Sequence, residues 1–452
     1  MRSATEAERS RLGRPSTILR PAVLINPFTP SDIAASPDQF FGREKELHAI
    51  ETSLPAGSIL IQGPIGIGKS SLLARALDVM AADNCDTRVV VADAEVRAVE
   101  DMARIILDAL VDLADERGGK FKLKFGLKVG FTEPSIEVES QDAIQDLRSG
   151  RNLAALKRIL EVDHRRRNAT NRKLIIIGID EADKAPQSIA RLVRSVWTQC
   201  QQVGIADVRF AIAGVSPLHQ QMVNEDRGVE RAFNRVLTLA PMSADETEQL
   251  LWAKFSAVVA DAEARDIKVN IEPDVIDRIA ALSGGHPHIV QLLGSHIIQH
   301  ENAQPDGLLG VKDLIGVLNR VCYEDRKATY AATLHKVETA GHLVALTTLL
   351  NHGELVEQGF PTRIYRQGAV DAVGTAALQW FIEHDILVPL SAEEYGLIDE
   401  FLRVRMTLDA EKPELRADVE AELAAHGHLL SWDEIQDYYR TLDEAENRFE
   451  EE

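Results

Sequence analysis

The stretch Ser58-Ile-Leu-Ile-Gln-Gly-Pro-Ile-Gly-Ile-Gly-Lys-Ser70 decides the fold of this 452-residue chain. Its apolar first half, Ser58 to Gln62, predicts a short buried strand, and the pattern from Lys69 to Met80 predicts an amphipathic helix directly after it. Between them, Gly63 to Ser70 matches G-x-x-x-x-G-K-[ST] in the strand, turn and helix context that this motif requires. The sequence therefore predicts a loop that wraps phosphate groups.

The residues of this loop suit a nucleotide. Its glycines let backbone N–H groups turn toward the phosphates, the helix N-terminus adds partial positive charge, and Lys69 reaches the β- and γ-phosphates. The Ser70 hydroxyl is expected to ligate Mg²⁺. The predicted contacts of the loop are Gly63, Pro64, Ile65, Gly66, Ile67, Gly68, Lys69, Ser70 and Ser71. ATP and Mg²⁺ are the predicted cofactors.

Two adjacent acids follow a second predicted strand, Leu174 to Ile179. A strand that served only the core would not end in neighbouring carboxylates, because burying them unpaired is costly. We expect Asp180 to hold the magnesium ion and Glu181 to polarise the attacking water. Asp183 suits a helix N-cap at least as well as a catalytic role. The sequence therefore predicts hydrolysis of ATP.

Strands and amphipathic helices alternate from Phe41 to Pro241, which predicts a parallel sheet with helices on both faces, a three-layer αβα domain of the α/β class. Another strand of this pattern, Val208 to Ala213, leads to Ser216. If this strand lies beside the strand of Asp180, the Ser216 hydroxyl would lie beside the γ-phosphate. An ordinary turn hydroxyl is the alternative.

The rest of the chain differs from this domain. After Ser243 helices dominate, with predicted spans 244–262, 273–283, 287–301 and 311–334. A helix over 370–384 followed by two β-like runs, 386–390 and 394–398, suggests a winged helix. The predicted division is a flexible N-terminal arm 1–35, an ATPase domain 36–241 with a β-ribbon insert 118–138, a helical lid 242–332, a winged-helix-like domain 333–408 and an acidic helical tail 409–452.

Composition excludes several classes of protein. With 45% hydrophobic and 27% charged residues, the chain is globular and long enough for two or three domains. The longest apolar runs stop far short of the ~20 residues that span a membrane. Cys85, Cys200 and Cys322 lack the spacing of a disulfide framework or a zinc site, so a reducing cytoplasm fits best. The net charge of −21 argues against bulk binding to nucleic acid.

Two basic features of the ATPase domain leave a local DNA contact open. Residues 118–138 alternate apolar and lysine positions. This pattern predicts either a hairpin at the sheet edge, whose lysines prevent pairing with other strands, or a contact surface for a partner or nucleic acid. The cluster from Arg165 to Lys173 is the second, and short clusters of this kind are usually solvated loops. By contrast, residues 330–405 carry 10 acidic and 5 basic residues. We therefore expect the winged helix to contact protein rather than DNA.

Four motifs together resemble the AAA+ and STAND P-loop ATPases, and most closely the group around origin-recognition-like initiators. They are Phe41-Gly-Arg-Glu-Lys-Glu-Leu47, the phosphate loop, IIIGIDEAD ending at Asp183, and Ser283-Gly-Gly-His-Pro287. The resemblance covers about Asn26 to Arg405. It implies that Phe41, Gly42 and Arg43 lie near the adenine and that Pro287, in a turn of the lid, closes over the base.

The sequence departs from this family at the arginine of the lid, and it leaves open which residue is the arginine finger. AAA+ lids present an arginine to the γ-phosphate just after the lid turn, whereas this chain has His286 and His288 there, which favours the STAND group. In initiator-like ATPases an arginine some ten residues before a proline is offered to the nucleotide of a neighbouring subunit. Arg231 matches that position best, with Arg235 as a rival and an ordinary surface arginine as the alternative.

The sequence thus predicts a nucleotide-driven switch with slow turnover when alone, because its arginine finger would come from another copy. Charge favours a signalling or assembly ATPase that acts on protein partners through the winged helix or the tail. The alternative is an initiator or loader that binds DNA through the lysine ribbon and the Arg165 to Lys173 cluster. A third possibility is a regulator that binds ATP but scarcely hydrolyses it. The intact Asp180 and Glu181 pair argues against this possibility.

Overall fold

A computed structural model of the chain describes residues 23–34, 36, 39–116, 142–170, 173–314, 320–351, 356–357 and 361–410. The predicted β-ribbon 118–138 and all but the first two residues of the predicted acidic tail lie outside these residues. Within the described part of the chain, no helix has the length and apolar character that crossing a membrane requires. The three cysteines are buried and form no disulfide in this structure.

Five parallel strands form the central sheet, in the order β2-β3-β4-β1-β5. They are β1 (Ser58–Gly63), β2 (Asp86–Val91), β3 (Ile175–Asp180), β4 (Val208–Val215) and β5 (Phe233–Thr238). The predicted strands are therefore confirmed to within one or two residues at most ends, and β3 and β4 are neighbours, as the prediction for Ser216 requires. Since all strands are parallel, their carboxyl ends share one edge of the sheet.

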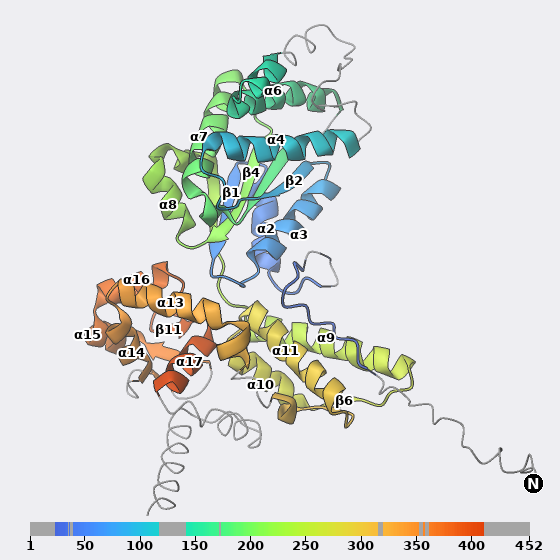
Figure 1. Cartoon of the computed structure of the whole chain (residues 1–452), viewed down its shortest axis with the longest axis vertical. Coiled ribbons are helices and arrows are strands. Elements are labelled where there is room, and N and C mark those ends of the chain that lie inside the picture. Colours follow the sequence, from blue (N-terminus) through green and yellow to red (C-terminus); the bar gives the residue numbers. More distant parts are fainter. Residues whose placement is uncertain are drawn as a thin grey trace, which may run out of the picture.

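Helices cover both faces of this sheet (Figure 1). Ile59 and Ile61 of β1 pack with α2 (Glu44–Ser53) and α3 (Lys69–Ala82), whereas Leu60 between them belongs to the core on the opposite face. That second core is formed with α4 (Val99–Glu116), α6 (Asn152–Thr170), α7 (Pro186–Val203) and α8 (Leu218–Glu225). The alternation along β1 produces the three-layer α/β arrangement that the sequence predicts.

The lid consists of three helices after β5, α9 (Ala244–Ala264), α10 (Pro273–Ser283) and α11 (Pro287–Ala303). Ser243 begins α9 with a capping box: its backbone N–H donates to Glu246 Oε2 at 2.8 Å, and its hydroxyl accepts from the Glu246 N–H. Gly285 packs so tightly that a Cβ there would lie 2.1 Å from the Met242 carbonyl oxygen. This close approach fixes the lid to the chain that leaves the sheet.

The C-terminal module, residues 327–410, contains helices around a four-stranded sheet of order β10-β11-β9-β8. Its elements are α13 (Lys327–Thr339), α14 (Leu343–Asn351), β8 (Val356–Glu357), β9 (Arg363–Tyr365), α15 (Arg366–Val373), α16 (Thr375–Glu383), β10 (Leu387–Pro389), β11 (Glu394–Leu397) and α17 (Glu400–Ala410). The predicted hairpin is confirmed by the antiparallel pairing of β10 and β11.

Two spans that periodicity predicts as single helices are each divided into separate elements in the structure, so both predictions are wrong on this point. The span 311–334 holds a 3-10 turn (Val311–Leu314), a π-helical turn (Arg320–Asp325) and then α13. The span 370–384 is divided between α15 and α16 at Gly374, whose φ of 81° lies in the left-handed region. Apolar side chains from both sides of each break belong to the same buried cluster.

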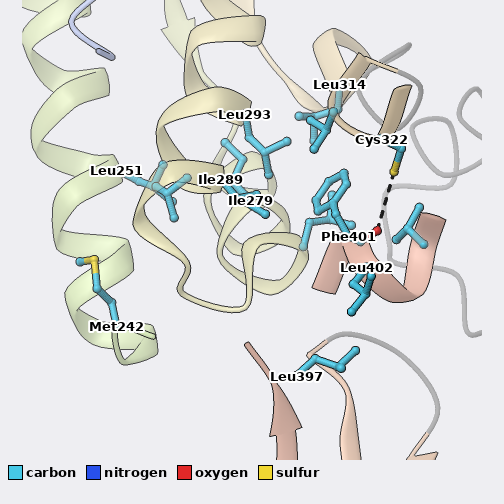
Figure 2. Close-up of a cluster of buried hydrophobic side chains, with 14 of the residues drawn as sticks. Met242, Leu251, Ile279, Ile289, Leu293, Leu314, Cys322, Leu397, Phe401 and Leu402 are labelled. Atoms are coloured by element: carbon cyan, nitrogen blue, oxygen red, sulfur yellow. Dashed lines mark hydrogen bonds between the residues drawn. The ribbon is translucent and has the colours of Figure 1, made fainter. Parts of the chain in front are cut away.

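The lid and the C-terminal module share one hydrophobic core (Figure 2). Leu251, Ile279 and Leu293 of the lid belong to the same buried cluster as Phe401 and Leu397 of the module. The Cys322 thiol donates a hydrogen bond to the Phe401 carbonyl oxygen, with 3.8 Å between the sulfur and the oxygen. Such a shared core resists separation, so the two parts are packed as one unit.

Residues 23–34, the N-terminal strap, correct the prediction of a flexible arm for this part of the chain. Leu24 and Phe28 are buried, and the Phe28 ring lies edge-on to Phe255 of the lid with 5.0 Å between centroids. The Leu24 backbone exchanges two hydrogen bonds with the Asn302 side chain. At its far end, the Ala34 N–H donates to the Ser71 hydroxyl at 3.0 Å. The strap therefore joins the lid to the helix that follows the phosphate loop.

Candidate functional site

The phosphate loop lies between β1 and α3 with its lysine drawn inward. The Lys69 ammonium group donates to the carbonyl oxygens of Gly63 at 2.9 Å and Pro64 at 2.6 Å. Burial lowers the pKa of Lys69, and nearby carboxylates oppose this effect. Gly66 and Gly68 adopt left-handed φ angles of 82° and 94°, which open the loop around the N-terminus of α3. The loop therefore has the glycine-dependent backbone shape that the motif predicts.

The two acids lie at the carboxyl end of β3, at the same edge of the sheet. Asp180 is buried, and its Oδ1 accepts from the Glu181 N–H at 2.9 Å. Glu181 has a left-handed φ of 52°, and its side chain is exposed. Lys184 forms an ion pair with the Glu181 carboxylate. The structure thus gives the neighbouring acids different surroundings, one buried and one accessible to water.

Oxygen donors at this edge fit a magnesium ion. The Asp180 carboxylate and the Ser70 hydroxyl in the first turn of α3 are the hard oxygen ligands that Mg²⁺ prefers, and such sites take further oxygens from substrate phosphates and water. Among the described residues, no three His, Cys, Asp or Glu side chains gather in a way that could hold a metal ion. The Asp180 and Ser70 oxygens suit a metal that also binds phosphate oxygens.

Asp183 has a different role from the predicted helix cap. It lies in the 3-10 turn η1 (Ala182–Lys184), and its Oδ1 accepts from the Val215 N–H at 2.8 Å. The N-cap of α7 is Ala185 instead, with proline in the first position of the helix. The Asp183 hydrogen bond ties the ends of β3 and β4 together and so fixes the position of Ser216.

Ser216 follows β4 and is buried, and its hydroxyl has no hydrogen bond of normal geometry to the described residues. A carboxylate that the sequence analysis missed, Asp385 of the C-terminal module, lies beside it. Burial raises the pKa of Asp385 to about 6, against the opposite effects of Ser216 and of the Lys69 and Lys336 charges. An acid far away in sequence therefore reaches the edge where the phosphate loop lies.

The lid contacts the phosphate loop through a histidine. His286 is buried, and its Nε2–H donates to the Ile65 carbonyl at 3.1 Å. A Cβ on Gly66 would lie 2.9 Å from the His286 ring, so glycine is required there. His288, which follows Pro287 at the start of α11, contacts the strap through a hydrogen bond from Nδ1 to the Pro30 carbonyl at 2.9 Å. Lid, strap and loop therefore meet at one place.

The Phe41 to Arg43 segment lies beside this junction. The Arg43 guanidinium donates to the Ala240 carbonyl at 2.6 Å and to the Ile67 carbonyl at 3.3 Å, so it fixes the loop and is fully engaged with protein atoms. Gly42 approaches the Glu246 side chain, which also accepts from the Arg43 N–H. In this structure the Arg43 guanidinium holds the chain after β5 and the phosphate loop together.

Arg231 lies just before β5, at the amino-terminal ends of the strands. It belongs to the 3-10 turn η2 (Arg227–Ala232) before β5, and its side chain is exposed. A cavity of about 350 Å³ opens there, lined by Arg231, Trp197 and Phe210 among others. Because β5 runs parallel to β1, its start lies at the edge opposite the phosphate loop. Arg231 is thus separated from the phosphate loop of its own chain and is exposed.

Acidification is expected to destabilise the chain through His286. Burial, then the charges of Arg326 and His288, holds the pKa of His286 well below the usual 6.5. The His286 side chain takes up a proton near pH 6.5 in the unfolded chain but not in the folded one. Its contribution to the free energy of unfolding is therefore complete above that pH and is lost as the pH falls below it. Thermal unfolding from about pH 7.5 to about pH 5 measures this loss, which His286→Gln should reduce.

Glutamine suits this test because its amide can still donate to the Ile65 carbonyl. The matched control is His48→Gln on the exposed side of α2, which should keep the pH dependence of the wild type. An equal loss of melting temperature in wild type and His286→Gln would contradict the assignment.

Comparison with known proteins adds information on the fold. No protein-family model matches the chain, and no curated protein is similar to it. The structure is similar to the Walker-type ATPase paby2304 of Pyrococcus abyssi, with a TM-score of 0.50 and 13% identity over 83% of this chain and 99% of that one. This match confirms the predicted α/β fold of a P-loop ATPase with its parallel sheet.

Two further solved structures have lower scores. They are the ORC2 protein of Aeropyrum pernix in its ADPNP and ADP complexes, with a TM-score of 0.47 and 14% identity over 92% of this chain and 99% of that one, and Cdc6p of Pyrobaculum aerophilum, with a TM-score of 0.44 and 14% identity over 86% and 98%.

Proposed function

We propose that this chain is a magnesium-dependent ATPase that works as a nucleotide-driven conformational switch. The observation that supports it most is the meeting of four groups at the carboxyl edge of the sheet: the phosphate loop with Lys69, the Asp180 and Glu181 pair, Ser216, and the lid held on the loop by His286. Catalysis of phosphoryl transfer consists mainly of positioning and charge neutralisation, and these groups supply both.

Each residue has a distinct role in this proposal. Lys69 leaves the loop carbonyls and neutralises the β- and γ-phosphates, while the backbone N–H groups of the loop hold them. Glu181, which is accessible to water, orients the attacking water and takes its proton. The Ser216 hydroxyl donates to the γ-phosphate. Ser70 and Asp180 hold the magnesium ion, which neutralises charge on the phosphates when bound.

The base is proposed to lie between the Phe41 and Gly42 segment and Pro287 of the lid. The Arg43 hydrogen bonds to Ala240 and Ile67 support the shape of this pocket, and His286 brings the lid turn onto the loop. Nucleotide binding would then join the sheet domain to the lid. Since the lid shares a core with the C-terminal module, any motion of the lid is passed to that module.

The C-terminal module is proposed to be a winged helix that acts on a protein partner. The helices α13 to α16 precede the antiparallel β10 and β11 hairpin, an order that supports this assignment. Residues 330–405 carry twice as many acidic as basic residues, which disfavours phosphate backbones and suits a protein surface. Partner binding would thus depend on whether ATP or ADP is bound.

Arg231 is proposed as the arginine finger for a neighbouring copy, because it is exposed and lies at the edge opposite its own phosphate loop. The test is phosphate release per mole of protein across a range of protein concentrations, with the mass of the assemblies recorded in ADP and ATP. We expect specific activity to rise with concentration in the wild type and to stay flat in Arg231→Ala.

The matched control is Arg235→Ala, an exposed arginine in β5 that should keep the concentration dependence. A wild type that fails to bind ATP would overturn the ATPase proposal itself. Binding with a specific activity that is independent of concentration would overturn only the role of Arg231.

A further inference from the structure

The N-terminal strap lies against the lid helices α9 and α11 (Figure 1). Its residues 23–29 form neither helix nor strand. From residue 24 to residue 30, the contacts of the strap follow α11 backwards, from residue 302 to residue 288. This length of helix is about 21 Å, and the same six steps of fully extended chain reach about 20 to 22 Å. The strap is therefore almost fully extended along the lid.

The lid holds the strap mainly through the backbone of the strap. The Asn302 side chain accepts from the Leu24 N–H at 2.6 Å and donates to the Leu24 carbonyl oxygen at 3.0 Å. Gln291 Oε1 accepts from the Thr29 N–H at 3.1 Å. Three strap carbonyl oxygens accept from basic side chains of the lid, Val23 from Arg265 at 2.8 Å, Pro27 from Lys254 at 2.7 Å and Pro30 from His288 at 2.9 Å. Main-chain hydrogen bonds of this kind give peptide-binding surfaces their affinity for extended chains.

One side chain of the strap, Phe28, fills a space that the lid leaves for it. A Cβ on Gly294 of α11 would lie 2.3 Å from the Phe28 ring. Phe255 of α9 meets this ring edge-on, and the Lys254 ammonium group lies 5.6 Å from the ring centroid. By contrast, the Ile25 side chain is 59% exposed. Recognition of the strap thus combines backbone contacts with a buried aromatic anchor, a pattern by which peptide-binding surfaces select their ligands.

The strap is attached to the lid far more than to the sheet domain. Of the hydrogen bonds that residues 23–34 form with other elements of the described chain, all but the one from Ala34 to Ser71 go to the lid. Side chains of the lid supply every one of these bonds, so α9 and α11 keep their own backbone hydrogen bonds without the strap. The strap is therefore bound as a peptide ligand is, and it completes neither a sheet nor a helix.

We propose that the side chains that hold the strap form a peptide-binding site on the lid, the strap site, and that an extended segment of a partner protein displaces residues 23–30 from it. The strap site consists of Lys254, Phe255, Arg265, Gln291, Gly294 and Asn302. The strap is its intramolecular ligand and indicates the chemistry of the partner segment. Residues 23–30 carry no charged side chain and present a proline followed by phenylalanine. The ligand is thus an uncharged segment with a Pro-Phe pair.

Exchange at the strap site also affects the phosphate loop. His288 donates to the Pro30 carbonyl, and a Cβ on Gly66 of the loop would lie 2.9 Å from the His288 Cβ. A partner segment that displaces the strap therefore removes a contact that holds His288 beside the loop. This inference goes beyond the proposed ATPase activity, because peptide binding requires no nucleotide.

The probe is a fluorescent peptide with the sequence of residues 23–32, titrated against the full chain and followed by fluorescence anisotropy. In the wild type the strap competes at an effective concentration on the order of 1 mM, so little peptide should bind. Phe28→Ala removes the aromatic anchor from the strap of the protein but not from the peptide. We expect the peptide to bind this variant at least about tenfold more tightly than the wild type, because its competitor is weakened.

Variants of the strap site, each made in the Phe28→Ala chain, test where the peptide binds. Gly294→Ala places a methyl group where the ring of the peptide must lie, and it should lower peptide affinity at least about tenfold. Asn302→Ala removes two backbone contacts and should lower the affinity about tenfold. The matched control, Gln304→Ala, removes an exposed amide two residues further on and should leave the affinity unchanged. A peptide with alanine in place of Phe28 should not bind.

Two results would overturn the proposal directly. They are a folded Phe28→Ala chain that does not bind the peptide, and peptide binding that Gly294→Ala leaves unchanged. Wild-type dimers that excess peptide dissolves would assign the strap site to the strap of a second copy and would overturn the assignment to a partner. Since these measurements need no nucleotide, a failure here leaves the ATPase proposal standing.

If Phe28→Ala does not fold, hydrogen exchange of the wild type decides. The Leu24 and Thr29 amides, which donate to lid side chains, should exchange at least about a hundredfold faster than the Leu293 amide in the middle of α11. Equal rates would mean that the strap opens only together with the lid, and the strap would then be a fixed part of the fold rather than an exchangeable ligand.

Discussion

Lys69→Met is expected to weaken ATP binding by about a hundredfold or more and to abolish phosphate release. The Lys69 side chain is buried and approaches the loop carbonyls of Gly63 and Pro64, so it is already in position for the phosphates. A buried cation that meets phosphate oxygens contributes far more than one on the surface, because little water competes with it. Titration with a fluorescent ATP analogue and a phosphate-release assay measure the two effects.

Methionine is the suitable replacement because it fills the volume of the lysine stem without its charge. The control is Lys45→Met, which removes an exposed lysine from α2 and should leave both measurements unchanged. Thermal unfolding of Lys69→Met should show a folded protein. ATP affinity within about threefold of the wild type would exclude the phosphate loop as the nucleotide site.

Glu181→Gln is expected to lower the rate of ATP hydrolysis by about a hundredfold or more while ATP affinity stays within about threefold. The glutamate is the accessible member of the acid pair, whereas Asp180 is buried. Glutamine keeps the shape and the contact with Lys184 but cannot take a proton from water. Single-turnover hydrolysis and an ATP titration separate the chemical step from binding.

The same variant should accumulate the ATP-bound form, which mass photometry in ATP would detect if that form assembles. Glu44→Gln, which removes an exposed acid from the first turn of α2, is the control and should hydrolyse ATP at the wild-type rate. Hydrolysis by Glu181→Gln within about twofold of wild type would remove this residue from the chemistry and transfer the role of the base to another group.

The parts of the fold that were predictable are those that depend on neighbouring residues. A strand buried on both faces, such as β3, is an unbroken apolar run, and the phosphate loop carries its own glycines, so both could be located from sequence alone. Asp183 shows the limit of this reasoning. Its position suits a helix cap, but its carboxylate accepts a hydrogen bond from the Val215 N–H of the adjacent strand. The sequence around Asp183 does not show which strands pair.

Asp385 and the N-terminal strap could not have been found in the same way. The carboxylate reaches the site only because α16 ends where the shared core fixes it, and nothing near Asp385 in sequence points to a phosphate. Phe28 of the strap lies in a segment of prolines and polar residues that predicts a flexible arm, yet its ring fills a space beside Gly294 of the lid. Both contacts depend on the packing of segments that are distant along the chain.

The close approach at Gly285 implies a constraint on how this sequence can diverge. A side chain at 285 would begin 2.1 Å from the Met242 carbonyl oxygen, which is backbone and cannot turn aside, at a φ of 76°. At the preceding Gly284, where φ is 54°, a Cβ would lie 2.9 Å from Cγ of the buried Glu400, whose carboxylate accepts hydrogen bonds from Thr362. Among descendants of this sequence that keep the lid in place, position 285 should hold glycine invariantly, and position 284 should favour glycine as well.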